Sequence, residues 1–131
     1  MDYFVSNKPG GRGNNANDGT SEATPWRDFA PVHMRTLQPG DRILLERGSC
    51  WNQELLIDDS GTEDAWCELG AYGSGPRPKI IRNGDAVERG IRMTNVSYWH
   101  VHDLEVGHAG IGILVIYDTP GHAGLRLEDI F

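Results

Sequence analysis

The last third of the chain contains an internal repeat with an offset of 26 residues. The segment WHVHDLEV, which begins at Trp99, aligns with LRLEDIF, which begins at Leu125. In this alignment the apolar positions match one another, and Asp103 matches Asp129. A short repeat of this kind cannot bury its apolar face alone and must stack on its neighbours. The register therefore predicts a solenoid.

The segment 67–93 indicates how such a coil turns. Its apolar runs span three to five residues and end at glycine, proline or asparagine. Glycine supplies 17 of the 131 residues, well above the usual ~7%, and its freedom to adopt positive φ suits frequent corners. No two-residue hairpin turn joins the runs. The pattern alone therefore leaves two folds equally open, a coil of parallel strands and an antiparallel β-sandwich.

Short strands account for most of the remaining pattern. They are expected at 2–6, 42–48, 53–59, 66–72, 79–83, 90–93, 98–106, 110–117 and 124–131. One helix is expected near residues 25–37, because Thr24 offers a capping hydroxyl and Pro25 suits the first helical position. Trp26 and Phe29 begin its apolar stripe, whereas Pro31 shortens or kinks it.

Length and charge bound the function. A chain of 131 residues predicts one domain, spanning 1–131. Its net charge of −7, with no basic run, argues against a nucleic-acid partner, since affinity for phosphates depends on clustered lysine and arginine. No run of 18 apolar residues is present, so the sequence predicts no membrane-spanning segment.

The N-terminal half resembles a known family. DYFVSNKPGGRGNNANDGTSEATPWRDFA, LQPGDRILLERGSCWNQELLI and SGTEDAWCELGAYGSGPRPKI are similar to the start of right-handed parallel β-helix proteins of the pectate-lyase-like superfamily. The match covers roughly residues 2–81. It implies an all-β, single-stranded, right-handed parallel β-helix, whose N-terminal helix caps the open end of the coil.

The resemblance also bears on the two cysteines, Cys50 and Cys67. Where they stand, the family has a small or β-branched residue and an aliphatic residue. Matched inward positions on neighbouring coils would bring the two thiols close together. A disulfide and a pair of buried free thiols therefore both remain open.

The function implied by the resemblance is carbohydrate chemistry. Most of these enzymes are secreted or cell-surface polysaccharide lyases that cleave acidic glycans by β-elimination. Ca²⁺ or an arginine neutralises the uronate carboxylate, and a lysine, arginine or histidine is the base. The alternatives are a glycoside hydrolase of the same fold and a non-catalytic carbohydrate-binding or cell-surface module. Exposed aromatic residues such as Trp51 or Tyr98 along a groove would favour the binding module.

Three residues are candidates for the site. Arg92 is expected to point outward from its strand, and His108 lies in the next turn, so both are catalytic candidates. Asp18, in the NDGTSE turn, is a candidate calcium ligand, with capping of that turn as the alternative reading. His100 and His102 alternate with apolar residues, which predicts an exposed face.

The end of the sequence suggests an incomplete solenoid. LEDIF, which ends at Phe131, stops partway through a coil without a polar cap, and solenoids need capping repeats. We therefore expect the chain to be the N-terminal part of a longer protein, with the main catalytic residues beyond Phe131 and little enzyme activity in the chain alone. We also expect end-to-end self-association through the last coil, where Leu125, Leu127 and Ile130 should face inward.

Overall fold

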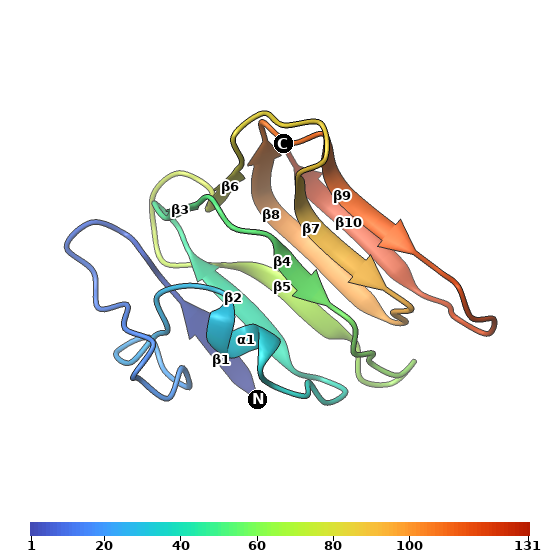
Figure 1. Ribbon diagram of the computed structural model, residues 1–131. Helices are drawn as coiled ribbons and strands as arrows, with labels where there is room; N and C mark the ends of the chain where they lie inside the picture. Colours follow the sequence, from blue (N-terminus) through green and yellow to red (C-terminus); the bar gives the residue numbers. More distant parts are fainter.

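The computed structural model describes residues 1–131 as a stack of parallel coils (Figure 1). Ten strands and one short helix make up the chain. In order they are β1 (Asp2–Val5), α1 (Ala30–His33), β2 (Arg42–Glu46), β3 (Cys50–Trp51), β4 (Leu55–Ile57), β5 (Cys67–Tyr72), β6 (Lys79–Ile81), β7 (Arg89–Thr94), β8 (Trp99–Gly107), β9 (Ile111–Ile116) and β10 (Leu125–Ile130).

The strands form three parallel sheets along the coil. Sheet A runs β1-β2-β5-β8-β10, sheet B contains β3, β6 and the end of β8, and sheet C runs β4-β7-β9. Every pairing between these strands is parallel. An antiparallel β-sandwich is thereby excluded, because its neighbouring strands would run in opposite directions.

The predicted 26-residue register is confirmed. Leu125 pairs with Trp99, and Ile130 pairs with Leu104. Between these pairs, Asp103 and Asp129 adopt φ values of 58° and 52°, the left-handed conformation that aspartate tolerates better than most residues. This bend turns β8 from sheet A into sheet B, where its last residues pair with β6.

The last strand ends one residue earlier than predicted. The sequence suggested a strand through Phe131, but β10 ends at Ile130. Phe131 still lies against the end of β8, because its N–H donates to the Leu104 carbonyl at 2.9 Å and its carbonyl accepts the N–H of Val106 at 2.7 Å. Its ring is 61% exposed and lies 3.9 Å from the guanidinium carbon of Arg77. The ring of Phe131 therefore packs against the Arg77 guanidinium and does not enter the core.

The N-terminal helix is much shorter than predicted. The sequence suggested residues 25–37, but α1 covers only Ala30–His33. Pro31 fits because it occupies the first turn, where its missing N–H costs no hydrogen bond. Before it, Trp26 forms a parallel bridge with Val5 instead of a helical turn. The hydroxyl of Thr24 donates to Asp18 rather than capping the helix.

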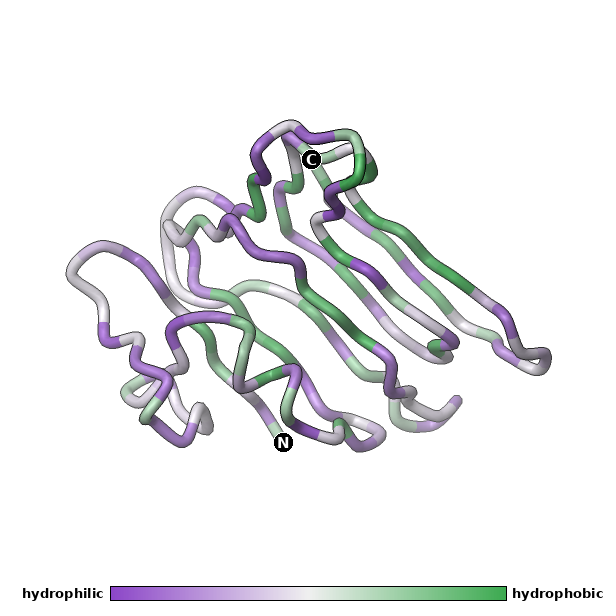
Figure 2. The backbone as a smooth tube through the Cα atoms, viewed as in Figure 1, coloured by the Kyte–Doolittle hydropathy of each residue, from purple (hydrophilic) through white to green (hydrophobic).

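The core runs through the centre of the coil. Figure 2 shows hydrophobic stretches along the strands and hydrophilic stretches in the connecting turns. Trp26 and Phe29, which are 4% and 0% exposed, join the core at its N-terminal end. The ring of Trp26 stacks on Tyr3, and Phe29 packs on Trp51. The N-terminal segment therefore covers the core with aromatic rings although most of it is not helical.

The one helix of the chain lacks the length and the hydrophobicity that a membrane-spanning helix needs.

The two cysteines are free thiols. Cys67 is buried in sheet A, and its Sγ donates to the Gln38 carbonyl at 3.4 Å. Cys50 is exposed and pairs with Lys79 in sheet B. The two positions are therefore not stacked on one another, as they would need to be to form a disulfide.

Candidate functional site

A groove of about 300 Å³ lies against sheet C, beside α1. Its apolar residues come mainly from β4 and from the region of the helix, and its charged residues come from the segment after the helix, the turn after β4 and β7. The groove is lined by Val32, His33, Arg35, Leu37, Leu56, Ile57, Asp58, Asp59, Arg92 and Thr94. This volume is at the lower end of the ~300–1,000 Å³ typical of small-molecule sites.

His33 closes the helix side of the groove. Its Nε2 accepts the backbone N–H of Leu56 at 3.0 Å, so the ring proton lies on Nδ1. Burial lowers the pKa of His33, and the nearby carboxylates of Glu54, Asp28 and Asp58 only partly oppose that effect. A lowered pKa agrees with a neutral ring that accepts at Nε2 and can donate from Nδ1.

Arg92 contributes a cation from the floor of the groove. It stands on β7 opposite Leu56 of β4 and points outward, as the sequence predicted. Its side chain is 40% exposed, and its Nη2 lies 3.4 Å from Oε1 of Glu54. One ion pair leaves several of the five guanidinium N–H groups available to a ligand.

The two carboxylates of the groove differ in their contacts. Asp59 accepts the backbone N–H of Leu37 at 2.8 Å, whereas Asp58 is exposed. Arg92 can donate hydrogen bonds, Asp58 can accept them, and Leu56 offers an apolar surface. The groove therefore suits a ligand that carries both hydroxyl groups and apolar ring faces.

The other catalytic candidate lies elsewhere. His108 is exposed in the turn after β8, with φ of 49°, and it does not line the groove that contains Arg92. The structure therefore does not bring these two residues into one pocket. The catalytic residues expected beyond Phe131 lie outside the described residues, and their position stays a prediction.

Asp18 holds a turn together. Its Oδ1 accepts the N–H of Thr20 at 3.0 Å and the hydroxyl of Thr24 at 2.8 Å. These hydrogen bonds lower the pKa of Asp18. Ca²⁺ takes about six to eight oxygen ligands, but no group of three or more histidine, cysteine, aspartate or glutamate side chains is arranged to hold a metal ion. Calcium binding at Asp18 therefore stays a prediction, whereas the capping of its turn is observed.

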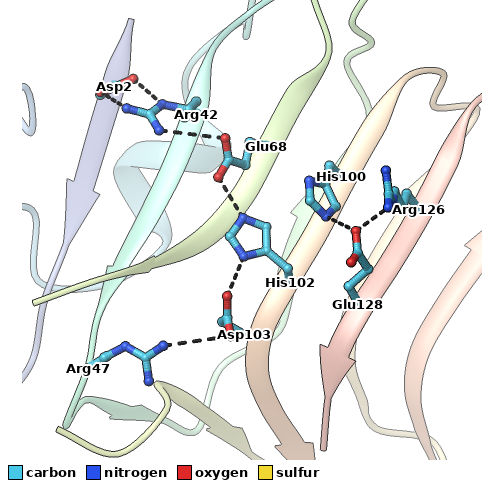
Figure 3. Close-up of polar contacts among 9 residues, drawn as sticks. All are labelled: Asp2, Arg42, Arg47, Glu68, His100, His102, Asp103, Arg126 and Glu128. Carbon is cyan, nitrogen blue, oxygen red and sulfur yellow. Dashed lines mark hydrogen bonds and ion pairs between the residues drawn. The ribbon is translucent and has the colours of Figure 1, made fainter. Parts of the chain in front are cut away.

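A second polar region covers the outer face of sheet A (Figure 3). We call it the charged ladder. It consists of Asp2, Arg42, Glu68, His102, Asp103 and Arg47, which come from four strands and one turn. Arg42 makes two hydrogen bonds to Asp2, at 2.8 and 2.6 Å, and its Nη1 lies 3.7 Å from Glu68. The Asp2 contact raises the pKa of Arg42 and is the largest influence on it.

His102 is the centre of the ladder. Its Nε2 lies 2.6 Å from Oε1 of Glu68, and its Nδ1 lies 2.7 Å from Oδ2 of Asp103. Ionised carboxylates only accept hydrogen bonds, so both ring nitrogens must carry protons. Burial pushes the pKa of His102 down, but its bonds to Asp103 and Glu68 outweigh this effect, and the pKa is raised.

His102 and Asp103 were not predicted in these roles. His102 was expected only to face solvent, and Asp103 was noted only for its match to Asp129 in the repeat. Instead, the carboxylate of Asp103 contacts His102 and lies 3.7 Å from Arg47. One sequence signal pointed toward the ladder: Arg42 and Glu68 are paired across β2 and β5, at the same offset as the repeat. Their opposite charges favour pairing.

The sequence of the chain was compared with protein families and with curated proteins. No protein-family model matches the chain. Among curated proteins it is similar to a lacto-N-biosidase from Bifidobacterium longum subsp. longum. The two are 40% identical over 88 residues, which cover 63% of this chain and 5% of that protein.

Among solved structures, the chain is similar to the GH136 lacto-N-biosidase from Eubacterium ramulus. The TM-score is 0.83 at 26% identity, over 99% of this chain and 26% of that one. Pectate lyase Pel9A gives a TM-score of 0.58 at 24% identity, over 80% of this chain and 27% of that one. Both are parallel β-helix proteins. The stacked parallel strands of this chain belong to the same fold.

Proposed function

We propose that this chain forms part of a glycoside hydrolase, and that the groove beside α1 contacts a sugar of the substrate. The likeness to two lacto-N-biosidases carries the proposal: 40% identity over 88 residues to one, and a TM-score of 0.83 over 99% of the chain to the other. The resemblance recognised in the sequence thus extends to the fold, with a hydrolase as the better-supported activity.

The lyase reading has less support. Pectate lyase Pel9A is 24% identical to the chain, and similarity at that level supports a shared fold rather than a shared reaction. The hydrolase was the alternative in the sequence analysis. It is favoured because both lacto-N-biosidase comparisons have higher identity and the structural one has a higher TM-score.

Within this proposal, the groove binds and orients the sugar. Glycoside hydrolysis commonly needs two carboxyl groups on either side of the bond, about 5 to 10 Å apart. In the groove, Asp59 is engaged by the Leu37 N–H, which leaves Asp58 and Arg92 to contact hydroxyl groups. We assign the acid and its partner carboxylate to further coils beyond Phe131, since the chain spans 26% of the E. ramulus structure.

Two further features complete the proposal. We expect the coil to be right-handed, because connections between parallel strands of one sheet have that hand in about 98% of cases. We also place the enzyme outside the cell or at its surface, where long glycans occur. A purely binding role has little support from Trp51, because its side chain is only 3% exposed.

The test uses the whole product of the gene that encodes this chain. We expect it to release the aryl group from an aryl lacto-N-bioside. Arg92→Ala should raise KM about tenfold with a smaller change in kcat, because it removes a binding contact. Arg12→Ala, at an exposed arginine outside the groove, is the matched control. Equal kinetics for the two variants would contradict the assignment of the groove.

A further inference from the structure

Three coils place equivalent residues at one corner of sheet A. Cys67 pairs with Trp99, and Trp99 pairs with Leu125, so the residues just before them occupy the same position on successive coils. These residues are Trp66, Tyr98 and Gly124. The corner therefore carries two aromatic rings followed by a residue without a side chain.

Trp66 is the exposed member of this corner. It is 38% exposed, whereas the other three tryptophans, at positions 26, 51 and 99, are at most 4% exposed. Tyr98 packs edge to face against it, with 5.5 Å between ring centroids and 73° between ring planes. A Cβ on Gly124 would lie 2.6 Å from the Tyr98 ring. Glycine thus makes room for the tyrosine, which in turn supports the indole.

A hollow of about 310 Å³ lies beside this corner, lined by Trp66, His100 and Arg126. Glu128 lies close to both polar side chains. Its Oε1 lies 2.5 Å from Nε of Arg126 and 2.9 Å from Nε2 of His100 (Figure 3). The His100 contact lies outside good hydrogen-bond geometry, so Nε2 has no hydrogen-bond partner. The terminal guanidinium nitrogens of Arg126, which is 66% exposed, make no other ion pair.

This set of groups matches the chemistry of a pyranose. The C–H groups of a sugar ring carry partial positive charge and pack on the electron-rich face of an indole. Hydroxyl groups can accept from Arg126 and donate to Glu128. A negatively charged sugar would meet the Glu128 carboxylate, which already neutralises the nearby cation. The hollow therefore suits a neutral sugar better than a uronate.

We propose that Trp66, His100 and Arg126 form a second sugar-binding subsite for a neutral hexopyranose, on sheet A and away from the groove on sheet C. It would hold a distant part of a long glycan whose other end lies in the groove. This inference rests on the proposed carbohydrate function, but it uses different residues and a different face of the coil.

Binding is tested with the whole gene product and methyl β-galactoside as the probe. Two-dimensional NMR should show shifts at the Trp66 indole N–H and at the backbone of His100 and Arg126. Trp66→Ala should weaken binding by about tenfold or more, as loss of an aromatic anchor does. Tyr117→Ala is the matched control, because Tyr117 is an exposed aromatic residue (46%) outside the hollow; it should leave the affinity unchanged.

Three results would overturn the inference. They are shifts confined to residues outside the hollow, equal weakening by the Trp66 and Tyr117 substitutions, and tighter binding of glucuronate than of methyl β-galactoside. Failure of the proposed function looks different: the whole gene product would not hydrolyse the aryl lacto-N-bioside, whatever the chain binds at Trp66. Hydrolysis without binding at Trp66 would instead leave the proposed function standing and remove the second subsite.

Discussion

His102 and Glu68 lie on neighbouring coils, with 2.6 Å between Nε2 of the histidine and Oε1 of the glutamate, although 34 residues separate them in the chain. Gly70 makes this approach possible. A Cβ at residue 70 would lie 2.7 Å from Cε1 and from Nε2 of the His102 ring, closer than a side-chain contact allows. The absence of a side chain on β5 therefore lets the imidazole lie across that strand and reach Glu68.

The first prediction concerns pH. Burial lowers the folded-state pKa of His102, but the hydrogen bonds to Asp103 and Glu68 outweigh burial and raise the pKa overall. The His100 ring, 4.6 Å away, and Arg47, which lies beyond Asp103, also face this cluster. The resulting stabilisation is fully present below the unfolded pKa of ~6.5 and is lost as pH rises through the higher folded value. His102→Gln should lower the free energy of unfolding by about 1–3 kcal/mol at acidic pH, and by progressively less above neutrality.

Urea denaturation between pH 5 and pH 9, read against a control variant, checks this expectation. His108→Asn is suitable because His108 is exposed and asparagine tolerates its positive φ. The control should parallel the parent protein at every pH. A difference between parent and His102→Gln that grows toward alkaline pH would show that the imidazolium does not bridge the two carboxylates.

The second prediction concerns Gly70. Gly70→Ala should displace the His102 ring, lower the pKa of His102 toward its ordinary value and destabilise the fold by about 1–3 kcal/mol, as overpacking does. Gly112→Ala is the matched control in a strand, because its new Cβ would meet Val106 at an ordinary 3.7 Å. NMR titration of the imidazole measures the first effect and denaturation the second. An unchanged His102 pKa in Gly70→Ala would refute the steric argument.

The third prediction concerns the N-terminal end of the core. Trp26 is 4% exposed, stacks on Tyr3 at 5.4 Å, and donates from Nε1 to the Asn17 carbonyl. Trp26→Ala should cost about 3–5 kcal/mol. Trp66→Ala, at the exposed tryptophan, should cost less than about 1 kcal/mol. Similar losses in denaturant unfolding would mean that Trp26 does not cap the core.

The fourth prediction concerns association. Leu127 pairs with the buried Val101, so it is on the core side of β10, yet it is 45% exposed. In this chain β10 has only β8 as a neighbour, and an open strand edge pairs readily with other chains. We expect concentration-dependent oligomers that Leu127→Glu reduces. Val87→Glu, at an exposed loop residue (72%), is the control. Light scattering that finds only monomer across the accessible concentrations would refute the expectation.

The sequence predicted the fold better than the site. The repeat predicted the pairing of Leu125 with Trp99, because apolar residues must stay in register when coils stack. It could not show that Glu68 lies beside His102, because the step from Glu68 to His100 is longer than the one from His100 to Arg126. Unequal coil lengths hide such cross-strand neighbours from any search at a fixed period.

The helix prediction failed for a different reason. The Thr24–Pro25 pair has the local signals of a helix start. However, the bridge from Trp26 to Val5 and the burial of the indole against the core stabilise the fold more than a further helical turn would. Tertiary packing therefore overrode local propensity. Arg92 was predictable as an outward residue from strand alternation. Its groove partners His33 and Asp58 were not, because α1 and the turn after β4 meet only in the folded chain.

Product analysis tests the central claim most directly. The whole gene product is incubated separately with an aryl lacto-N-bioside and with pectate, and release of the aryl group and ultraviolet absorbance of unsaturated uronate are followed in both. A glycoside hydrolase built on these coils releases the aryl group and produces no unsaturated uronate. Unsaturated uronate from pectate, with the aryl glycoside left intact, would contradict the account and identify the coils as part of a lyase.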